Sequence, residues 1–102
     1  MATYSAGLAI DSGVNTSATA AGGGPVTIYT VPANLYFRGW LQPLQIGSGS
    51  FTVRVNGTSV GTTWPDALST IWFPPGTVFS VGASGGTVEA RIIGSLFKTV
   101  EP

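Results

Sequence analysis

The sequence predicts an all-β protein, namely a single antiparallel β-sandwich, jelly-roll-like, with an extended N-terminal arm. Short runs of β-branched and aromatic residues recur along the chain, at spacings of roughly 8–12 residues, which are typical of sandwiches and small barrels. Gly, Pro or Asn separates these runs, and no segment of helical length has a 3.6-residue period free of glycine and proline. A length of 102 residues fits one domain.

The N-terminal residues 1–24 are expected to form the arm. Ala, Ser, Thr and Gly dominate them, and this composition is typical of flexible segments. Tyr4, Leu8 and Ile10 are their apolar anchors, and in an extended chain Leu8 and Ile10 share one face. A short edge strand or an arm laid on a neighbouring molecule would use this pattern, and we favour the neighbour. Residues 25–102 are then expected to form the β-sandwich domain.

The clearest local element is a β-hairpin. Apolar side chains at Phe51, Val53 and Val55 alternate with polar ones, which is the pattern of a strand with one buried face. Asn56-Gly57 follows, and this dipeptide accepts the positive φ angles of a type I′ turn. The pattern therefore predicts a tight turn at this dipeptide.

The remaining strands are predicted from β-branched and aromatic runs that end at turn residues. Trp40 and Phe79 are expected in the core, because large aromatic residues supply much of the buried area of a small β domain. The other strands are expected at residues 26–31, 35–41, 68–73, 77–81, 87–93 and 95–100.

The charge balance argues against nucleic-acid binding. Charged residues make up 8% of the chain and the formal net charge is zero, whereas nucleic-acid binding needs a basic patch that displaces counterions. A neutral surface rich in Thr, Ser, Gly and Asn repels copies of itself only weakly. Such a surface suits a protein that neighbours cover; a small monomer with a hydroxyl-rich surface is the alternative.

The residue types needed for most catalytic chemistry are scarce. The chain contains no cysteine and no histidine, which removes disulfides, thiolate sites, cysteine nucleophiles and the commonest metal ligand. Its four carboxylates, at Asp11, Asp66, Glu89 and Glu101, form no expected pair in a cleft, as acid–base catalysis would need. We therefore expect no enzyme, no cofactor and no metal site.

The sequence has neither a secretory signal nor an apolar run of the roughly 18–20 residues that cross a membrane. We expect synthesis in the cytoplasm and no membrane contact.

The aromatic residues are the candidates for contacts with a partner. Trp64 lies beside Pro65 in a predicted loop, where it has no strand face on which to be buried. We favour a subunit-interface anchor over a ligand platform, because interfaces favour Trp. Trp64 and Trp72 could instead stack on sugars, while core packing is the simpler interpretation of most of the aromatic residues. The residues expected to contact a partner are Tyr4, Leu8, Ile10, Trp64 and Trp72.

Four short segments resemble small virion proteins of tailed bacteriophages. They are residues 27–33 (TIYTVPA), 53–57 (VRVNG), 73–76 (FPPG) and 78–81 (VFSV). The resemblance covers about residues 25–97. It is to capsid decoration (cement) proteins and to tail-fibre or tail-tip domains.

This resemblance implies a structural protein of a phage particle, most simply a capsid decoration protein that stabilises the shell through protein–protein contacts. The partners would be other copies of the chain, as a homotrimer, and a major capsid or other virion protein. The N-terminal arm would bind the shell, and the protein would reside in the virion. The alternative is a carbohydrate- or receptor-binding module of a tail fibre or tail tip, which would expose Trp64 and Trp72 as coplanar rings.

Overall fold

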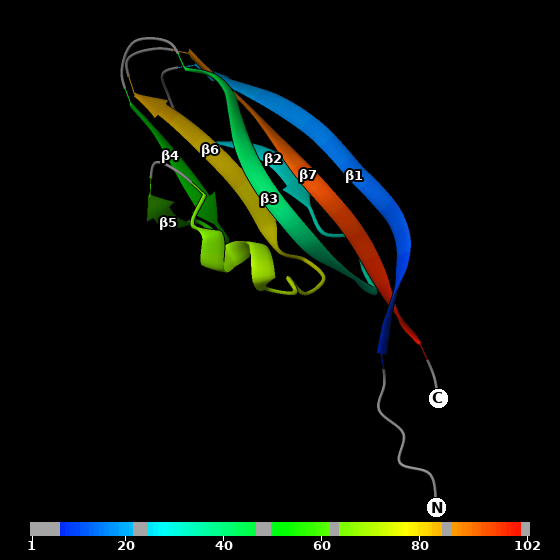
Figure 1. The fold of residues 1–102 in the computed structure, drawn as a ribbon. Coiled ribbons are helices and arrows are strands. Elements are labelled where there is room, and N and C mark those ends of the chain that lie inside the picture. Colours follow the sequence, from blue (N-terminus) through cyan, green and yellow to red (C-terminus); the bar gives the residue numbers. More distant parts are fainter. Residues whose placement is uncertain (1–6, 22–24, 47–49, 62–63, 85–86, 101–102) are drawn as a thin grey trace, which may run out of the picture.

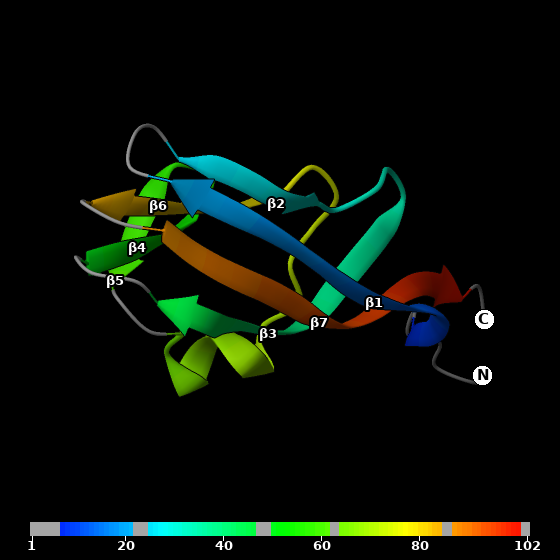
Figure 2. The ribbon, with the colours of Figure 1, turned by 90° about the horizontal axis from the view of Figure 1, so that it is seen from above.

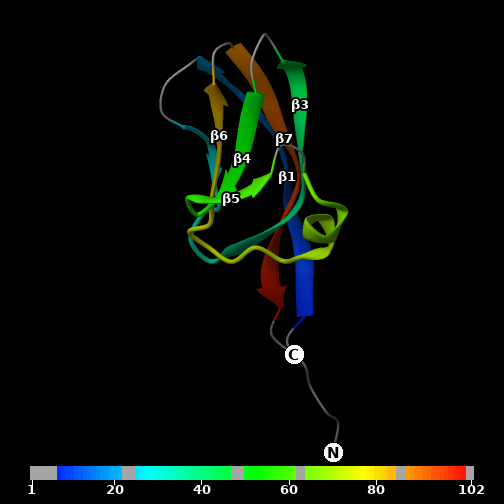
Figure 3. The same cartoon turned by 90° about the vertical axis from the view of Figure 1, so that its left-hand side faces the viewer.

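The structure is a computed structural model that describes residues 7–21, 25–46, 50–61, 64–84 and 87–100. Two antiparallel sheets pack face to face, as the layers in Figure 3 show. This arrangement confirms the predicted all-β sandwich; the jelly-roll topology stays a prediction. Within the described ranges the only helix is a short 3-10 helix.

The two sheets contain three and four strands (Figure 1). The three-stranded sheet has the order β1 (Gly7–Ala21), β7 (Thr87–Val100) and β3 (Leu35–Ile46). The four-stranded sheet has the order β2 (Val26–Thr30), β6 (Val78–Ser84), β4 (Ser50–Val55) and β5 (Thr58–Gly61). The 3-10 helix η1 (Asp66–Thr70) lies beside β3.

Residues 7–21 do not form an arm laid on a neighbouring molecule, which corrects the favoured prediction; they form an edge strand, the alternative expected for this segment. They are β1, which pairs with β7 from Gly7 opposite Val100 to Ala21 opposite Thr87. The reason is a period-2 alternation within the Ser/Thr/Ala-rich segment, which buries Val14 and Ala20 against the other sheet. A domain boundary at residue 24 would therefore divide one sheet. The rest of the predicted arm, including Tyr4, lies outside the described residues.

The core lies between the sheets. Phe37 and Phe79 are fully buried, with ring centroids 5.4 Å apart, and Phe73 lies 5.0 Å from Phe79. The prediction of a core position is confirmed for Phe79 and wrong for Trp40, which is 47% exposed. Because β3 points Phe37 and Leu41 inward, alternation turns Trp40 outward.

The predicted hairpin is confirmed. β4 pairs with β5, and Asn56 and Gly57 have φ angles of 51° and 81°, as a type I′ turn requires. The turn is also fastened to β6: the Asn56 amide donates to the Val78 carbonyl at 2.8 Å, and the Val78 amide donates to Asn56 Oδ1 at 2.9 Å.

The prediction of a strand at residues 68–73 is wrong. Its first part belongs to η1, where the Thr70 hydroxyl donates to the Ala67 carbonyl at 2.8 Å; such local bonds compete with strand pairing. Phe73 alone pairs with β3, through two backbone hydrogen bonds with Phe37 of 2.8 and 2.9 Å. Pro74 and Pro75 follow, and they lack the N–H groups that would continue the ladder.

Candidate functional site

The outer face of the three-stranded sheet carries exposed apolar side chains. Opposite residues of antiparallel strands share a face, so the pairing of Trp40 with Ile93, and of Ile10 and Tyr36 with Phe97, places these side chains together. Ile10 is 68% exposed and Trp72 is 37% exposed. We call this surface the aromatic face; it comprises Ile10, Tyr36, Trp40, Trp72, Ile93 and Phe97.

Trp72 reaches the aromatic face from the segment that follows η1. Its ring meets the ring of Phe97 edge to face, with centroids 4.5 Å apart at 85°. The Arg38 guanidinium carbon lies 4.8 Å from the centroid of Trp72, and Arg38 Nε donates to the Ser69 carbonyl at 3.3 Å. These contacts fix the Trp72 ring in place while part of it stays exposed.

Trp64 lies on the opposite side of the sheet. It is half-buried, and its ring packs 6.0 Å from Phe73 and 5.9 Å from Phe79. Alternation along the chain separates Trp72 from Phe73, so Trp72 lies on the outer face and Trp64 lies against the core. The exposed, coplanar pair of Trp64 and Trp72 that the carbohydrate-binding alternative predicted is therefore absent, and the favoured expectation that Trp64 anchors a subunit interface stays a prediction.

The apolar anchors of the N-terminal segment lie in β1. Leu8 is half-buried opposite Thr99, and Ile10 is exposed opposite Phe97. A bulge at Asp11 follows, between Ile10 and Ser12. Ile10 thus belongs to the aromatic face, and Leu8 is its near neighbour on the same strand face.

Sequence reasoning missed Tyr36 and Trp40 as surface residues. The signal was present, because Tyr36, Arg38 and Trp40 stand two residues apart, the spacing of one strand face. The apolar residues between them suggested a strand covered on both faces. Only the two-layer arrangement shows that this side is open, because no described segment forms a third layer over the outer face of this sheet.

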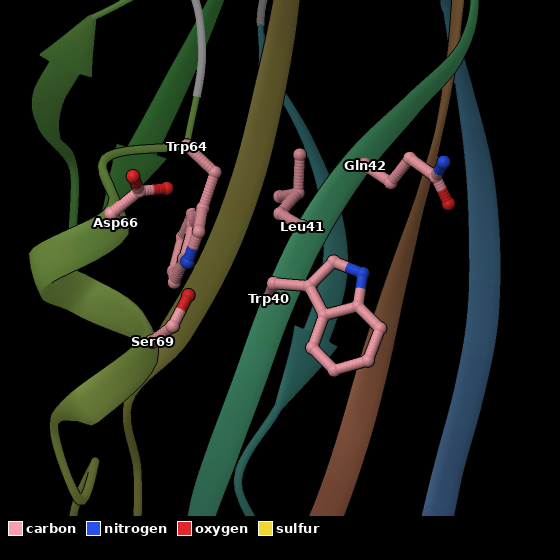
Figure 4. A pocket seen from close by; sticks show the side chains of 6 residues that line it. All are labelled: Trp40, Leu41, Gln42, Trp64, Asp66 and Ser69. Carbon is pink, nitrogen blue, oxygen red and sulfur yellow. The ribbon is translucent and has the colours of Figure 1, made fainter.

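A second feature is an open depression of about 330 Å³ between β3 and η1. Figure 4 shows Trp64, Asp66 and Ser69 on one side of it and the β3 residues on the other. Asp66 is the one charged residue among those that line it. The lining residues are Trp40, Leu41, Gln42, Trp64, Asp66 and Ser69.

The indole nitrogen of Trp64 has an unusual environment in this depression. Nε1 is buried and has no hydrogen-bond partner in the described part of the chain. Leaving a buried donor without an acceptor costs about 1–3 kcal/mol. Figure 4 shows the ring nitrogen turned toward Ser69 of η1, whose hydroxyl can both accept and donate a hydrogen bond.

Among the ionisable groups of the described residues, the one resolved pKa shift belongs to a residue outside both the aromatic face and the depression beside η1. Burial raises the pKa of Tyr29, whose ring packs 5.9 Å from that of Phe37, away from the aromatic face. Among the described residues, no group of three or more Asp or Glu side chains could hold a metal ion. In the same ranges, no helix has the length and apolar character needed to cross a membrane.

The chain matches no family model, no curated protein and no solved structure.

Proposed function

We propose that the protein is a structural component of a phage particle, most simply a capsid decoration protein that binds its neighbours through the aromatic face. The observation that carries this proposal is the group of exposed apolar side chains on the outer face of the three-stranded sheet, among them Ile10, Trp40 and Trp72. Contiguous apolar patches on soluble monomers mark interaction surfaces when they exceed a few hundred Å².

The side chains of the aromatic face are of the kinds that anchor interfaces. Trp, Tyr and Arg dominate binding hot spots, and the aromatic face contains Trp40, Trp72 and Tyr36 with Arg38 beside them. Phe97 and Arg38 already fix the Trp72 ring, so little conformational entropy is lost on binding. Repetition over many copies would multiply a modest contact into a large stabilisation of the shell.

The proposed partners are other copies of this chain and a major capsid or other virion protein. The near absence of charge, 8% of residues with zero net charge, leaves little repulsion between copies. The homotrimer stays a prediction, which light scattering of the purified chain across a dilution series tests.

The test of the proposed function combines composition with mutagenesis. We expect mass spectrometry to detect the protein in particles purified from the organism that encodes it. We expect the double variant Trp40→Ser with Trp72→Ser to be missing from those particles. Ile71→Ser is the matched control, because Ile71 is 41% exposed but precedes Trp72 and so lies off the aromatic face. Incorporation of a folded double variant at the normal level would refute the role of this face.

A second candidate function is carbohydrate binding, and the depression beside η1 favours it. The Asp66 carboxylate accepts hydrogen bonds, while Gln42 and Ser69 both donate and accept. Their chemistry suits a neutral ligand that carries several hydroxyl groups. We expect Asp66→Asn and Gln42→Ala to abolish any signal on an array of neutral glycans, with Thr58→Ala, on exposed β5, as the control. An array with no signal for the unmodified chain excludes this candidate.

A further inference from the structure

The two sheets have four edges, and three of them are short or covered. β5 and β2 are edge strands of only four and five residues. The edge of β3 is covered by Phe73, which bonds to Phe37, and by η1, where Arg38 Nε donates to Ser69. Natural sheets commonly protect their edges in these two ways.

The fourth edge, β1, is long and open. It contains 15 residues and, within the described part of the chain, pairs only with β7. β1 also contacts β2, and Figure 2 shows these strands meeting where β1 ends. Figure 1 shows β1 as the outermost strand of its sheet. The backbone groups on that side are available for pairing.

The sequence of β1 does little to prevent such pairing. It contains no Lys, Arg or Pro, which are the usual protective residues of an exposed edge. Its one charge is Asp11, at the bulge between Ile10 and Ser12. From Ser12 to Ala21 the register with β7 is regular, and the side chains are small, so a second strand could approach closely.

We propose that β1 pairs with β1 of a second copy as an antiparallel ladder about a two-fold axis normal to the sheet. This inference rests on the proposed structural function and is an alternative to the predicted homotrimer, because a two-fold contact joins two copies and not three. An isologous contact is self-complementary and closes at two copies. A ladder over residues 12–18 would form roughly seven backbone hydrogen bonds, and it would place the two Asp11 carboxylates at its opposite ends.

The resulting sheet has six strands, β3-β7-β1 from each copy. Because the axis is normal to the sheet, both outer surfaces point to the same side. The two aromatic faces then lie next to each other as one extended surface. Edge pairing between two copies therefore doubles the area that can contact a third partner.

Cysteine cross-linking tests the ladder directly, because the natural chain has no cysteine. One cysteine is introduced at a time at each position from 12 to 18, and each variant is mildly oxidised. Only the residue on the two-fold axis meets its own copy within the 4.4–6.8 Å Cα separation of a disulfide; each step away from the axis adds about 7 Å along the strands. We expect cross-linked dimer at one position and its loss at the others.

Thr27→Cys on β2 is the matched control, because Thr27 is also exposed on an edge strand, and it should give no dimer. A β1 series without dimer at any position, or with equal dimer at every position, overturns the inference. Trp40→Ser with Trp72→Ser should leave the cross-linking pattern unchanged. If the double variant is lost from particles but no β1 position gives a cross-linking peak, the edge contact alone is refuted. If one β1 position gives a peak but the double variant is incorporated normally, the role of the aromatic face alone is refuted.

Discussion

Gly39 and Gly94 lie directly opposite each other in β3 and β7, and the ring of Phe37 covers both. A Cβ on Gly39 would collide with the Ile93 carbonyl oxygen, and one on Gly94 would collide with the Arg38 carbonyl oxygen. Either added Cβ would lie 2.7 Å from the Phe37 ring. The aromatic ring thus fills the space that two missing side chains leave, as is known for glycines in sheets.

Gly94→Ala is expected to destabilise the protein. The new methyl group meets backbone atoms of β3 and the buried Phe37 ring, and overpacking of this kind costs about 1–3 kcal/mol. Gly13→Ala is the matched control, because a Cβ at Gly13, on the neighbouring strand, meets nothing within 4 Å. Urea unfolding of both variants measures the difference, and equal midpoints would show that β3 and β7 can separate at no cost.

Deletion of residues 2–21 is expected to abolish folding, since it removes β1. In β7, the buried residue Ala90 lies opposite Ala18 of β1, and the buried residue Ile92 lies opposite Thr16 of β1. The deletion therefore exposes this side of the core to solvent. Deletion of residues 2–6 is the control, because it leaves every described strand in place. Far-UV circular dichroism and amide dispersion in NMR spectra report the outcome. A folded 2–21 deletion would restore the idea of a dispensable arm.

Arg38→Ala is expected to loosen the Trp72 ring without unfolding the protein. The guanidinium stacks on Trp72 at 4.8 Å and also bonds to the Ser69 carbonyl; a partly exposed cation–π contact is worth about 0.5–1 kcal/mol. Narrowing of the Trp72 indole signal in NMR spectra would report the added motion. Arg54→Ala serves for comparison, because Arg54 bonds to Gly57 on the other sheet; an identical response in both variants would contradict the assignment.

Stability is expected to fall above about pH 10, in part through Tyr29. Burial raises the pKa of Tyr29 in the folded protein, so above the ordinary pKa the unfolded chain releases its proton first. The unfolded state then binds fewer protons, and the free energy of unfolding decreases as the pH rises. Thermal unfolding between pH 8 and 11 measures this slope. Tyr29→Phe should make it shallower, and an unchanged slope would assign the effect to other groups.

Sequence rules predicted the structural features that depend on residue type and on nearby residues along the chain. The turn at Asn56-Gly57 followed from turn chemistry, and the buried position of Phe79 followed from the tendency of large aromatic residues to pack in a small β core. The state of residues 7–21 did not, because their composition suggests flexibility and only pairing with β7 reveals the buried face of Val14. Trp40 was missed for a related reason: its exposure depends on how many strands and layers surround β3.

The candidate site was only partly predictable for the same reason. Trp72 and Ile10 were expected to contact a partner, and both lie on the aromatic face. Trp64 was placed at an interface because a loop residue has no strand face of its own. The chain from η1 to Phe73 nevertheless passes along β3, and this path allows Trp64 to pack on Phe73 and Phe79.

The two substitutions Trp64→Phe and Trp64→Ala are expected to differ widely in stability. Trp64→Ala removes a half-buried ring that packs on Phe73 and Phe79; loss of a fully buried large aromatic side chain costs about 3–5 kcal/mol, so we expect a loss near the lower end of this range. Trp64→Phe keeps a ring and removes Nε1, which is buried without a partner. Because a buried donor without an acceptor destabilises the folded protein by about 1–3 kcal/mol, its removal offsets part of the stability lost with the smaller ring.

Chemical denaturation of both variants, with the unmodified chain, measures this difference. A small loss for Trp64→Phe and a large loss for Trp64→Ala would show that the indole nitrogen contributes nothing to the stability of the free protein. A Trp64→Phe variant as unstable as Trp64→Ala would instead mean that Nε1 has an acceptor in solution. Ser69 lines the same depression, so Ser69→Ala should then cause a comparable loss.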